Sequence, residues 1–455
     1  MNKSNRRLSI FLIAAIGISS FSSAQQLEPI LKELIQKGLE KSHAINIHNL
    51  DSKQAKVDQK LAKVVFLPKV TFNSSFTRLD NDITFDDDTQ NLLIATQKLL
   101  IKEAIGIPFN DALPNNIPLS EIPNLQSKNI LKSSVDVDWI LFSGFEATNA
   151  YKASKHKEAS LNYVVIAKKD KIALKIIETY DKLALVCASK RVLISSKKYL
   201  DEQEYYVKKA IKNGLAIPLN RKKIELAKQQ LAAKQLEYNH NKSLLVEVLY
   251  QLTGENRKSL SLVNPTLRSF STEFSNPEKR NEIKALEEAE KATIFKAKME
   301  KSNFIPKIAL KGHYEFIEED LSLLDPKWYV GVGIQWNAFD GFKSKLKSIK
   351  TKIESKKYRA QIENANEMIE LSIMKAELSY EAALENTKIV EKEIELASDT
   401  YEMINKQYKN NLTSINDVLD ALNDLEKASF KLQNSYYNER RAITNLLHAK
   451  GILKY

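Results

Sequence analysis

Two segments of this chain are free of helix-breaking residues over unusual lengths. Residues 145–213 contain no Gly or Pro, and neither do residues 343–450. A helix over 147–213 would be about 100 Å long at the 1.5 Å rise per residue of an α-helix. A compact globular domain does not accommodate such a rod. The sequence therefore predicts an elongated, mainly helical protein with a small β part.

The chain also contains an internal repeat. The motif that begins at Trp139 recurs 197 residues later at Trp336. The Leu-Pro motif at Pro68 recurs as Ile-Pro at Pro306, 238 residues later. The two offsets differ by 41 residues, which indicates an insertion in the first copy. We expect this insertion, roughly 80–132, to form a long loop on the outer side of the sheet, where β-barrels of outer membranes carry their long loops.

The repeat gives the expected domain organisation. It comprises a signal peptide at 1–24, a first repeat at 25–254, a linker at 255–275 and a second repeat at 276–455. In the first repeat we expect a helix at about 28–66, strands at 69–79 and 132–142, a long helix at 145–213 and a helix at 220–253. In the second we expect a helix at about 278–304, strands at 307–317 and 328–338, a long helix at 343–410 and a helix at 416–450.

The expected strands alternate apolar and polar residues, as strands with two different faces do. In one of them Trp328, Val330 and Val332 alternate with Tyr329 and Gly331. Each strand has about ten residues, which is the length and pattern of a transmembrane β-strand. A half-buried soluble sheet predicts the same alternation. Periodicity alone leaves both interpretations open.

The first 24 residues are typical of a secretory signal peptide. Lys3, Arg6 and Arg7 precede an apolar run at 8–18, and small residues precede Gln25. That run is shorter than the roughly 20 residues needed to span a bilayer as a helix, and no longer apolar segment follows. We therefore expect an exported chain, and any membrane insertion must use β-strands.

Charge and composition argue against several functions. The formal charge is +12, of which three charges belong to residues 1–24. The basic residues are mixed with Asp and Glu at helical spacing, which indicates solvated helix faces rather than a nucleic-acid site. Only 11 Gly are present, and no metal-binding, phosphate-loop or catalytic motif occurs. We expect no cofactor and no enzymatic activity. The single Cys187 lies in an apolar segment and is expected to be a core residue.

Four strands per chain cannot close a pore. An isolated sheet in lipid would leave unpaired edges, and outer-membrane barrels have at least about eight strands. If the strands lie in the membrane, the protein must oligomerise, and three copies would supply twelve strands.

The chain resembles the TolC-type outer-membrane efflux proteins over almost all of its mature length. The most specific segment runs from Asn411 to Asp420 and reads NLTSINDVLD. It resembles the family's second periplasmic hairpin, in which Gly is followed six residues later by Asp-Val-Leu-Asp. Asn411 replaces that Gly, as Asn can where φ is positive. The first hairpin keeps Gly214-Leu215 but has Asn220 where Asp is common.

The resemblance implies a homotrimer with a twelve-stranded barrel in the outer membrane and a twelve-helix tunnel through the periplasm. Such a duct receives cargo from an inner-membrane efflux or secretion pump and a periplasmic adaptor, and itself does no bond chemistry. Drugs, metals and secreted proteins all remain open as cargo. The main alternative is an exported helical scaffold or surface coiled-coil protein without a pore.

The resemblance also assigns candidate site residues. Asp417 and Asp420 would face the tunnel at its narrow periplasmic end and form acidic rings that favour cations. Tyr408 takes the place of a tyrosine that helps to hold the closed state, while Thr413 stands where the family has the arginine partner. With Asn220 also changed, the closed-state lock must be weaker or built differently. The expected adaptor-docking tips comprise Gly214, Leu215, Asn220, Asn411 and Leu412.

Each of these assignments has a structural alternative. Asp417 could cap the last helix, since Asp is favoured at helix N-termini. Asp420 could be stabilised by the helix dipole without any role in transport. The basic run Arg221-Lys222-Lys223 could be a solvated face rather than an adaptor contact.

Overall fold

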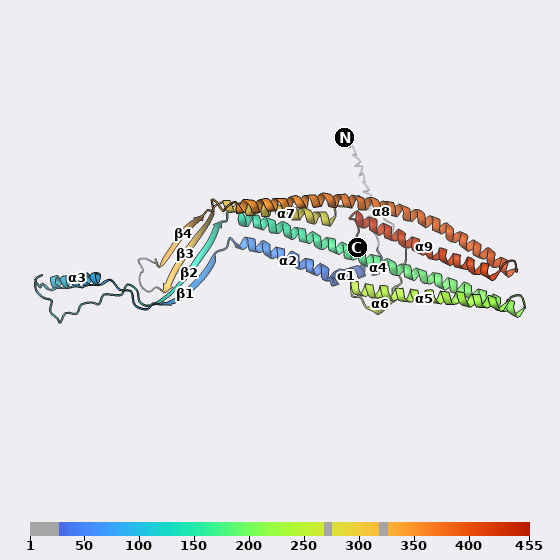
Figure 1. Ribbon diagram of the computed structural model, residues 1–455, viewed down its shortest axis with the longest axis horizontal. Helices are drawn as coiled ribbons and strands as arrows, with labels where there is room; N and C mark the ends of the chain where they lie inside the picture. The colour runs from blue at the N-terminus through green and yellow to red at the C-terminus, as the bar shows by residue number, and fades with distance from the viewer. Residues whose placement is uncertain (1–26, 268–274, 318–325) are drawn as a thin grey trace, which may run out of the picture. The chain divides into compact units, whose positions relative to one another are not determined.

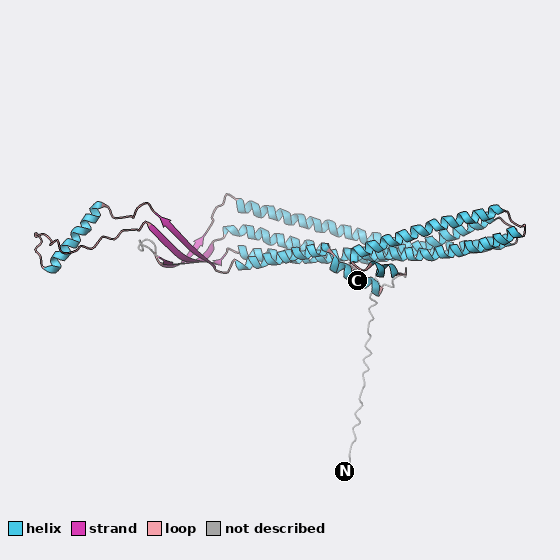
Figure 2. Ribbon diagram, turned by 90° about the horizontal axis from the view of Figure 1, so that it is seen from below, coloured by secondary structure: helices cyan, strands magenta, loops and turns pink. Residues whose placement is uncertain are grey.

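The computed structural model describes residues 27–267, 275–317 and 326–455. The segment interpreted as a signal peptide, 1–24, lies outside these residues. Helices dominate the described chain, and one small antiparallel sheet accompanies them (Figures 1 and 2). The elements are α1 (Pro29–Lys41), α2 (His43–Val64), β1 (Lys69–Arg78), α3 (Asp87–Ile105), β2 (Asn129–Phe142), α4 (Glu146–Lys212), α5 (Pro218–Thr253), α6 (Arg257–Leu262), α7 (Asn281–Lys301), the 3-10 turn η1 (Ser302–Phe304), β3 (Lys307–Ile317), β4 (Trp328–Gln335), α8 (Lys343–Lys409) and α9 (Ile415–Ala449).

The chain folds into two compact units, and each unit combines segments of both sequence repeats. The first unit contains the described residues of Met1–Asn49, Asn162–Ala285 and Ile362–Tyr455. The second contains Leu50–Leu161 and Leu286–Gln361, and therefore holds the whole sheet. The long helices α4 and α8, of 67 residues each, contribute residues to both units.

The sheet has the order β1-β2-β3-β4, with every neighbouring pair antiparallel. Val70 lies opposite Val137, and Leu310 lies opposite Val332. In the described part of the chain, β1 and β4 each pair with a single strand. Both outer strands therefore present a row of backbone donors and acceptors that a further strand could pair with.

The two faces of the sheet differ in chemistry. Apolar side chains cover one face and are mostly open to solvent in the single chain: Val332 is 65% exposed and Ile334 71%. The other face is polar, with Asp136 accepting hydrogen bonds from Asn73 (2.6 Å) and contacting His313 (2.7 Å). A soluble sheet would bury its apolar face, so this face needs an apolar environment from outside the chain.

The repeat is visible in the backbone where a strand leads into a long helix. Gly144 and Gly341 have φ values of +62° and +66°, and the residues after them, Phe145 and Phe342, both have φ +66°. A positive φ is uncommon for a bulky residue, so its occurrence at equivalent positions indicates one turn used twice. In both copies the Phe ring also packs edge-on against a second Phe three residues earlier.

A tryptophan fixes the same strand end in each repeat. The indole N–H of Trp139 donates to the carbonyl of Phe66 at 2.9 Å, and that of Trp336 donates to the carbonyl of Phe304 at 3.1 Å. Each bond joins the end of a strand to the segment that precedes the neighbouring strand. The sequence similarity at offsets of 197 and 238 thus corresponds to equivalent contacts.

Three local expectations were wrong. The helix expected at 28–66 is interrupted at Ser42, which is extended (φ −64°, ψ 111°) and whose hydroxyl accepts from Ile45 N at 3.3 Å; this is the hydrogen bond of a helix N-cap. The linker at 255–275 contains α6, because Asn256 caps it and the fully buried Leu260 anchors it. The insertion is not only loop, since it contains the 19-residue helix α3.

The two largest hydrophobic clusters among the described residues lie in the first unit. One joins α1, α4, α5 and α6 through residues such as Leu31, Ile176 and Leu249, and it includes Cys187, buried as expected. The other joins α4, α5, α8 and α9 near their connecting turns, through residues such as Val207 and Val418. None of the described helices is long and apolar enough to cross a membrane.

Candidate functional site

The two connections α4–α5 and α8–α9 have the same backbone geometry. Gly214 (φ +71°) and Asn411 (φ +60°) both adopt the left-handed conformation predicted for Asn411 from the sequence. Leu215 N donates to Ala210 O at 2.8 Å, and Leu412 N donates to Gln407 O at 2.9 Å. These bonds have the 6→1 form that closes a helix after a left-handed residue.

Each turn presents an apolar side chain to solvent. Leu215 is 65% exposed and Leu412 is 75% exposed. In the first turn Ile217 and Leu219 are also exposed. The tips thus offer apolar contacts that need no desolvation of charge, which suits a protein interface.

Asp417 forms part of the N-terminal cap of α9. Its carboxylate accepts from Ser414 N (2.9 Å), Ser414 Oγ (2.7 Å) and Thr413 Oγ1 (2.6 Å), while Ser414 Oγ accepts from Asp417 N at 3.3 Å. Ser414 and Asp417 therefore form a capping box. These hydrogen bonds, first that from Thr413 and then those from Ser414, lower the pKa of Asp417 to about 2. The capping role considered from the sequence exists, and the side chain is also an exposed anion.

The equivalent position in the first tip lacks this cap. Asn220 lies 197 residues before Asp417, and the N-cap of α5 is Ile217, which offers no side-chain hydrogen bond. Pro218 at the first helical position supplies the helix start instead. The two tips have the same backbone conformation, but the residue at this position is neutral in the first tip (Asn220) and acidic in the second (Asp417).

Asp420 lies one turn further along α9, on the same side as Asp417. It is exposed and lines a groove of about 560 Å³ formed by α4, α5 and α9. The groove also contains the ion pair of Lys234 with Glu426 and the side chain of Lys223. Within one chain Asp420 is therefore a groove residue, and a second copy would be needed to make it part of a ring.

Tyr408 is half-buried and packs against the cluster near the tips. Burial raises its pKa, so the hydroxyl stays protonated. Thr413, which stands where the family has an arginine, donates to Asp417 instead. The described contacts of Tyr408 are thus packing contacts.

A buried amide near the tips was not singled out from the sequence. Gln203 of α4 is fully buried, and its Nε2 donates to Asn405 Oδ1 of α8 at 2.9 Å. It lies between the buried Leu200 and Val207 at core spacing. A polar residue at a core position of a helix pair is a recognised signal for a register-setting contact, and it could have been used here.

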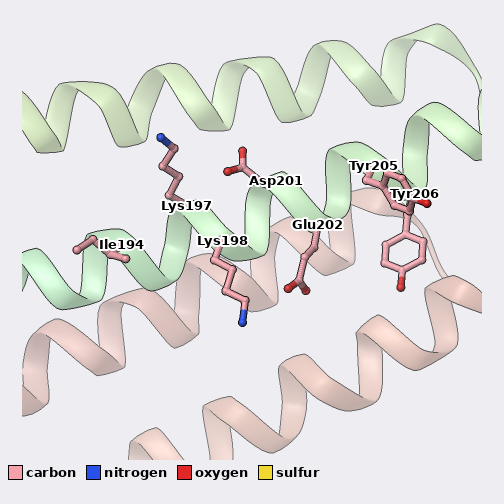
Figure 3. Close-up of a pocket in the computed structure, with 7 residues that line it drawn as sticks. All are labelled: Ile194, Lys197, Lys198, Asp201, Glu202, Tyr205 and Tyr206. Carbon is pink, nitrogen blue, oxygen red and sulfur yellow. The ribbon is translucent and has the colours of Figure 1, made fainter.

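A second unassigned feature is a tyrosine pair on α4, close to the first tip. Tyr205 and Tyr206 pack edge-on at 5.9 Å, and the ammonium groups of Lys209 and Lys409 lie 4.5 and 4.4 Å from their ring centres. Figure 3 shows both rings at one end of a shallow helix face. The face has a volume of about 680 Å³ and is lined by Ile194, Lys197, Lys198, Asp201, Glu202, Tyr205 and Tyr206. Exposed tyrosine rings are enriched at protein interfaces, whereas the lysines and carboxylates around them are depleted there.

No cluster of three or more metal-ligating side chains occurs among the residues that the structure describes. The site residues expected from the sequence instead gather at the two tips of the first unit, where the structure shows caps, exposed leucines and carboxylates. The two tips thus combine exposed apolar side chains with the exposed carboxylates of Asp417 and Asp420.

Neither a protein-family model nor a curated protein matches the chain by sequence. Solved structures do match. The outer membrane protein VceC from Vibrio cholerae aligns with a TM-score of 0.70 and 15% identity over 93% of this chain and 96% of its own. The outer membrane channel CmeC from Campylobacter jejuni aligns with a TM-score of 0.70 and 15% identity over 99% and 93%. The channel-forming protein CusC aligns with a TM-score of 0.71 and 14% identity over 92% of each chain.

These alignments cover nearly the whole chain and nearly the whole of each matched protein. At identities near 15% the likeness concerns the fold. It confirms the fold class that the resemblance implied, a mainly helical chain with a small sheet. The chain has the fold of TolC-type outer-membrane channels.

Proposed function

We propose that this protein is an outer-membrane exit duct, assembled from three copies and serving an inner-membrane efflux or secretion pump through a periplasmic adaptor. The observation that carries the proposal is the sheet. Within the described residues it has two unpaired edges and an apolar face that the single chain leaves exposed. A lipid-facing barrel wall satisfies both features at once.

Three copies would close the barrel by pairing β4 of one copy with β1 of the next. Because β1 and β4 run in opposite directions in the sheet, this pairing would be antiparallel, like all the others. The apolar face would contact lipid, and the face with Asp136 and His313 would line the lumen.

Exposed apolar residues on the helices support the same assembly. On α8, Ile389, Leu396 and Met403 follow one another at seven-residue spacing and are 65%, 56% and 61% exposed. On α5, Leu226 and Leu236 are also exposed. The seven-residue spacing on α8 is typical of packing between helices. We therefore expect the exposed apolar residues of α8 and α5 to contact neighbouring copies in a helical tunnel.

The tips would form the periplasmic end of this tunnel. Leu215 and Leu412, with Gly214, Asn220 and Asn411 shaping the turns, would dock the adaptor. Asp417 and Asp420 would form acidic rings at the aperture, beside Tyr408. In each copy the hydrogen bonds of the cap lower the pKa of Asp417, which favours the charged carboxylate at neutral pH.

A matched pair of substitutions on β4 tests the membrane assembly. Val332→Arg places a charge on the apolar face, where each lipid-facing Arg costs about 2–4 kcal/mol near the membrane centre. Gly331→Arg places the same charge on the polar face, where a Cβ would meet nothing within 4 Å. We expect heat-modifiable trimers in the outer-membrane fraction for the wild type and Gly331→Arg, and their loss for Val332→Arg.

The competing scaffold interpretation predicts no loss of assembly in Val332→Arg. In a soluble protein Val332→Arg removes an exposed apolar side chain and should leave assembly unchanged or improve solubility. Recovery of both variants in a soluble periplasmic fraction, together with no conductance in planar bilayers, would contradict the proposal.

A further inference from the structure

The insertion between β1 and β2 contains a capped helix, α3. Asp86 caps α3 by accepting from Thr89 N at 3.3 Å, and Gly106 (φ +73°) ends it. The segments that connect α3 to β1 and β2 are paired with each other. Leu79 N donates to Lys128 O at 2.7 Å, and Ile83 and Gln126 form an antiparallel β-bridge. In Figures 1 and 2 α3 lies beyond the sheet, at the end of the β1–β2 hairpin.

This helix carries apolar side chains that nothing in the described chain covers. None of its 19 residues is buried. The sequence repeats after seven residues: Leu92-Leu93-Ile94 recurs as Leu99-Leu100-Ile101. At 3.6 residues per turn, four of these leucines fall within about one third of the helix circumference. We call this the leucine face; it comprises Leu92 (66% exposed), Leu93 (37%), Leu99 (41%) and Leu100 (61%).

The chemistry of α3 favours another helix over lipid as the occupant of the leucine face. A helix that lies on a membrane is rich in Lys and Arg and carries Trp or Phe on its apolar side. In contrast, α3 has three acidic residues against two lysines, Lys98 and Lys102, and no aromatic residue. Leucines repeated at seven-residue spacing are the pattern by which helices pack together.

The proposed trimer supplies such helices at the right distance. Twelve strands about 4.8 Å apart and tilted by about 40° give a barrel radius of roughly 12 Å. The segment between β1 and α3 has eight residues, 79–86, and can span up to about 26 Å. Because Leu79 and Ile83 are bonded to Lys128 and Gln126, both chain segments would lean inward together, and this length is enough to bring α3 from the rim of the barrel to the threefold axis.

We infer that the three α3 helices of the trimer pack their leucine faces against one another over the outer mouth of the barrel. The inference rests on the proposed function and adds a contact between copies at the end of the barrel opposite the tunnel. Packing of three leucine faces removes from water the surface that each copy leaves exposed, and it places a helical cap across the exit.

Cysteine cross-linking of the full-length protein in outer membranes tests this contact. In a Cys187→Ser background, Leu100→Cys is on the leucine face, while Lys98→Cys lies about 160° around the same helix. A bismaleimide that spans the roughly 8–10 Å between packed helices should produce covalent dimers from Leu100→Cys and none from Lys98→Cys. Neither substitution disturbs a core, since α3 has no buried residue.

The trimer is measured separately on the same samples by migration without heating. Trimers that form while Leu100→Cys gives no more dimer than Lys98→Cys overturn this inference and leave the proposed duct standing. Absence of trimers overturns both. Shielding of the thiol in Leu100→Cys from a water-soluble maleimide without any cross-link would identify lipid or another protein as the occupant, which also overturns the inference.

Discussion

A buried ion pair in the first unit offers the sharpest stability prediction. Asp181 on α4 is fully buried and Arg440 on α9 is 1% exposed, and Arg440 Nε donates to Asp181 Oδ1 at 2.6 Å. Arg440 also donates to the carbonyl of Thr266 at 3.1 Å and lies 3.9 Å from Glu28. One guanidinium thus joins α4, α9, the segment after α6 and the start of the described chain.

Replacing one partner should cost far more than replacing both. Burial raises the pKa of Asp181, against the opposing effect of Arg440, so desolvation of the charges is a large part of the energetics. Asp181→Leu removes the carboxylate that Arg440 contacts at 2.6 Å and that Arg441 faces at 3.7 Å, and leaves the Arg440 charge buried. Breaking a buried pair in this way typically costs about 3–5 kcal/mol, whereas replacing both partners with apolar residues is often neutral or stabilising.

The assay is the thermal unfolding midpoint of the purified protein, followed by circular dichroism. For a unit of this size 3–5 kcal/mol corresponds to a fall of about 6–20 °C in Asp181→Leu. The double variant Asp181→Leu/Arg440→Met should return close to the wild-type midpoint. Lys388→Met, which breaks an exposed pair with Glu385, is the control and should not move it.

Two results would refute this reasoning. If Asp181→Leu unfolds at the wild-type temperature, Arg440 finds compensation that the described contacts do not contain. If the double variant is as unstable as the single one, the pair stabilises the unit directly and desolvation is not the dominant cost.

Four further predictions concern the proposed duct. The double variant Leu215→Glu/Leu412→Glu should abolish export while trimers persist on unheated gels; normal export would show that these are not docking tips. The double variant Asp417→Asn/Asp420→Asn should remove the block of planar-bilayer conductance by periplasmic trivalent cations; an unchanged block would leave both as helix-start residues only. With Asp420→Asn alone, the remaining block should weaken as falling pH protonates the Asp417 carboxylates. A tag inserted near Asp87 should be accessible from outside the cell without loss of trimers, and access from the periplasm alone would reverse the topology.

The sequence was sufficient for the long elements because their signals are local. Absence of Gly and Pro located α4 and α8, and the alternation of apolar and polar residues located the four strands. The repeat added precision, since Gly144 and Gly341 mark equivalent turns. Where a local signal was available but unused, the expectation failed: Asp86 and Gly106 are good helix caps around α3, and Ser42 is a good N-cap.

The remaining features could not be obtained from one sequence. Asp181 and Arg440 are 259 residues apart, and nothing in either neighbourhood indicates that they meet. Gln203 could be recognised as a polar residue at a core position, but its partner Asn405, 202 residues away, could not. Such contacts depend on the packing of whole helices, and helix periodicity predicts which face is buried without predicting its partner.

The difference between the two tips separates two roles that the repeat would otherwise make equal. Both tips close with a left-handed residue and an exposed leucine, and under the proposed function both would dock the adaptor in the same way. Only the second tip has a carboxylate at the third helical position, where Ser414 holds it ionised, whereas the first has the neutral Asn220. Restoring the symmetry with Asn220→Asp should therefore add a second set of charges near the aperture without changing the turn. If cation selectivity rises while adaptor docking is unchanged, both tips share the adaptor contact, and the acidic charge of the natural aperture comes from α9 alone.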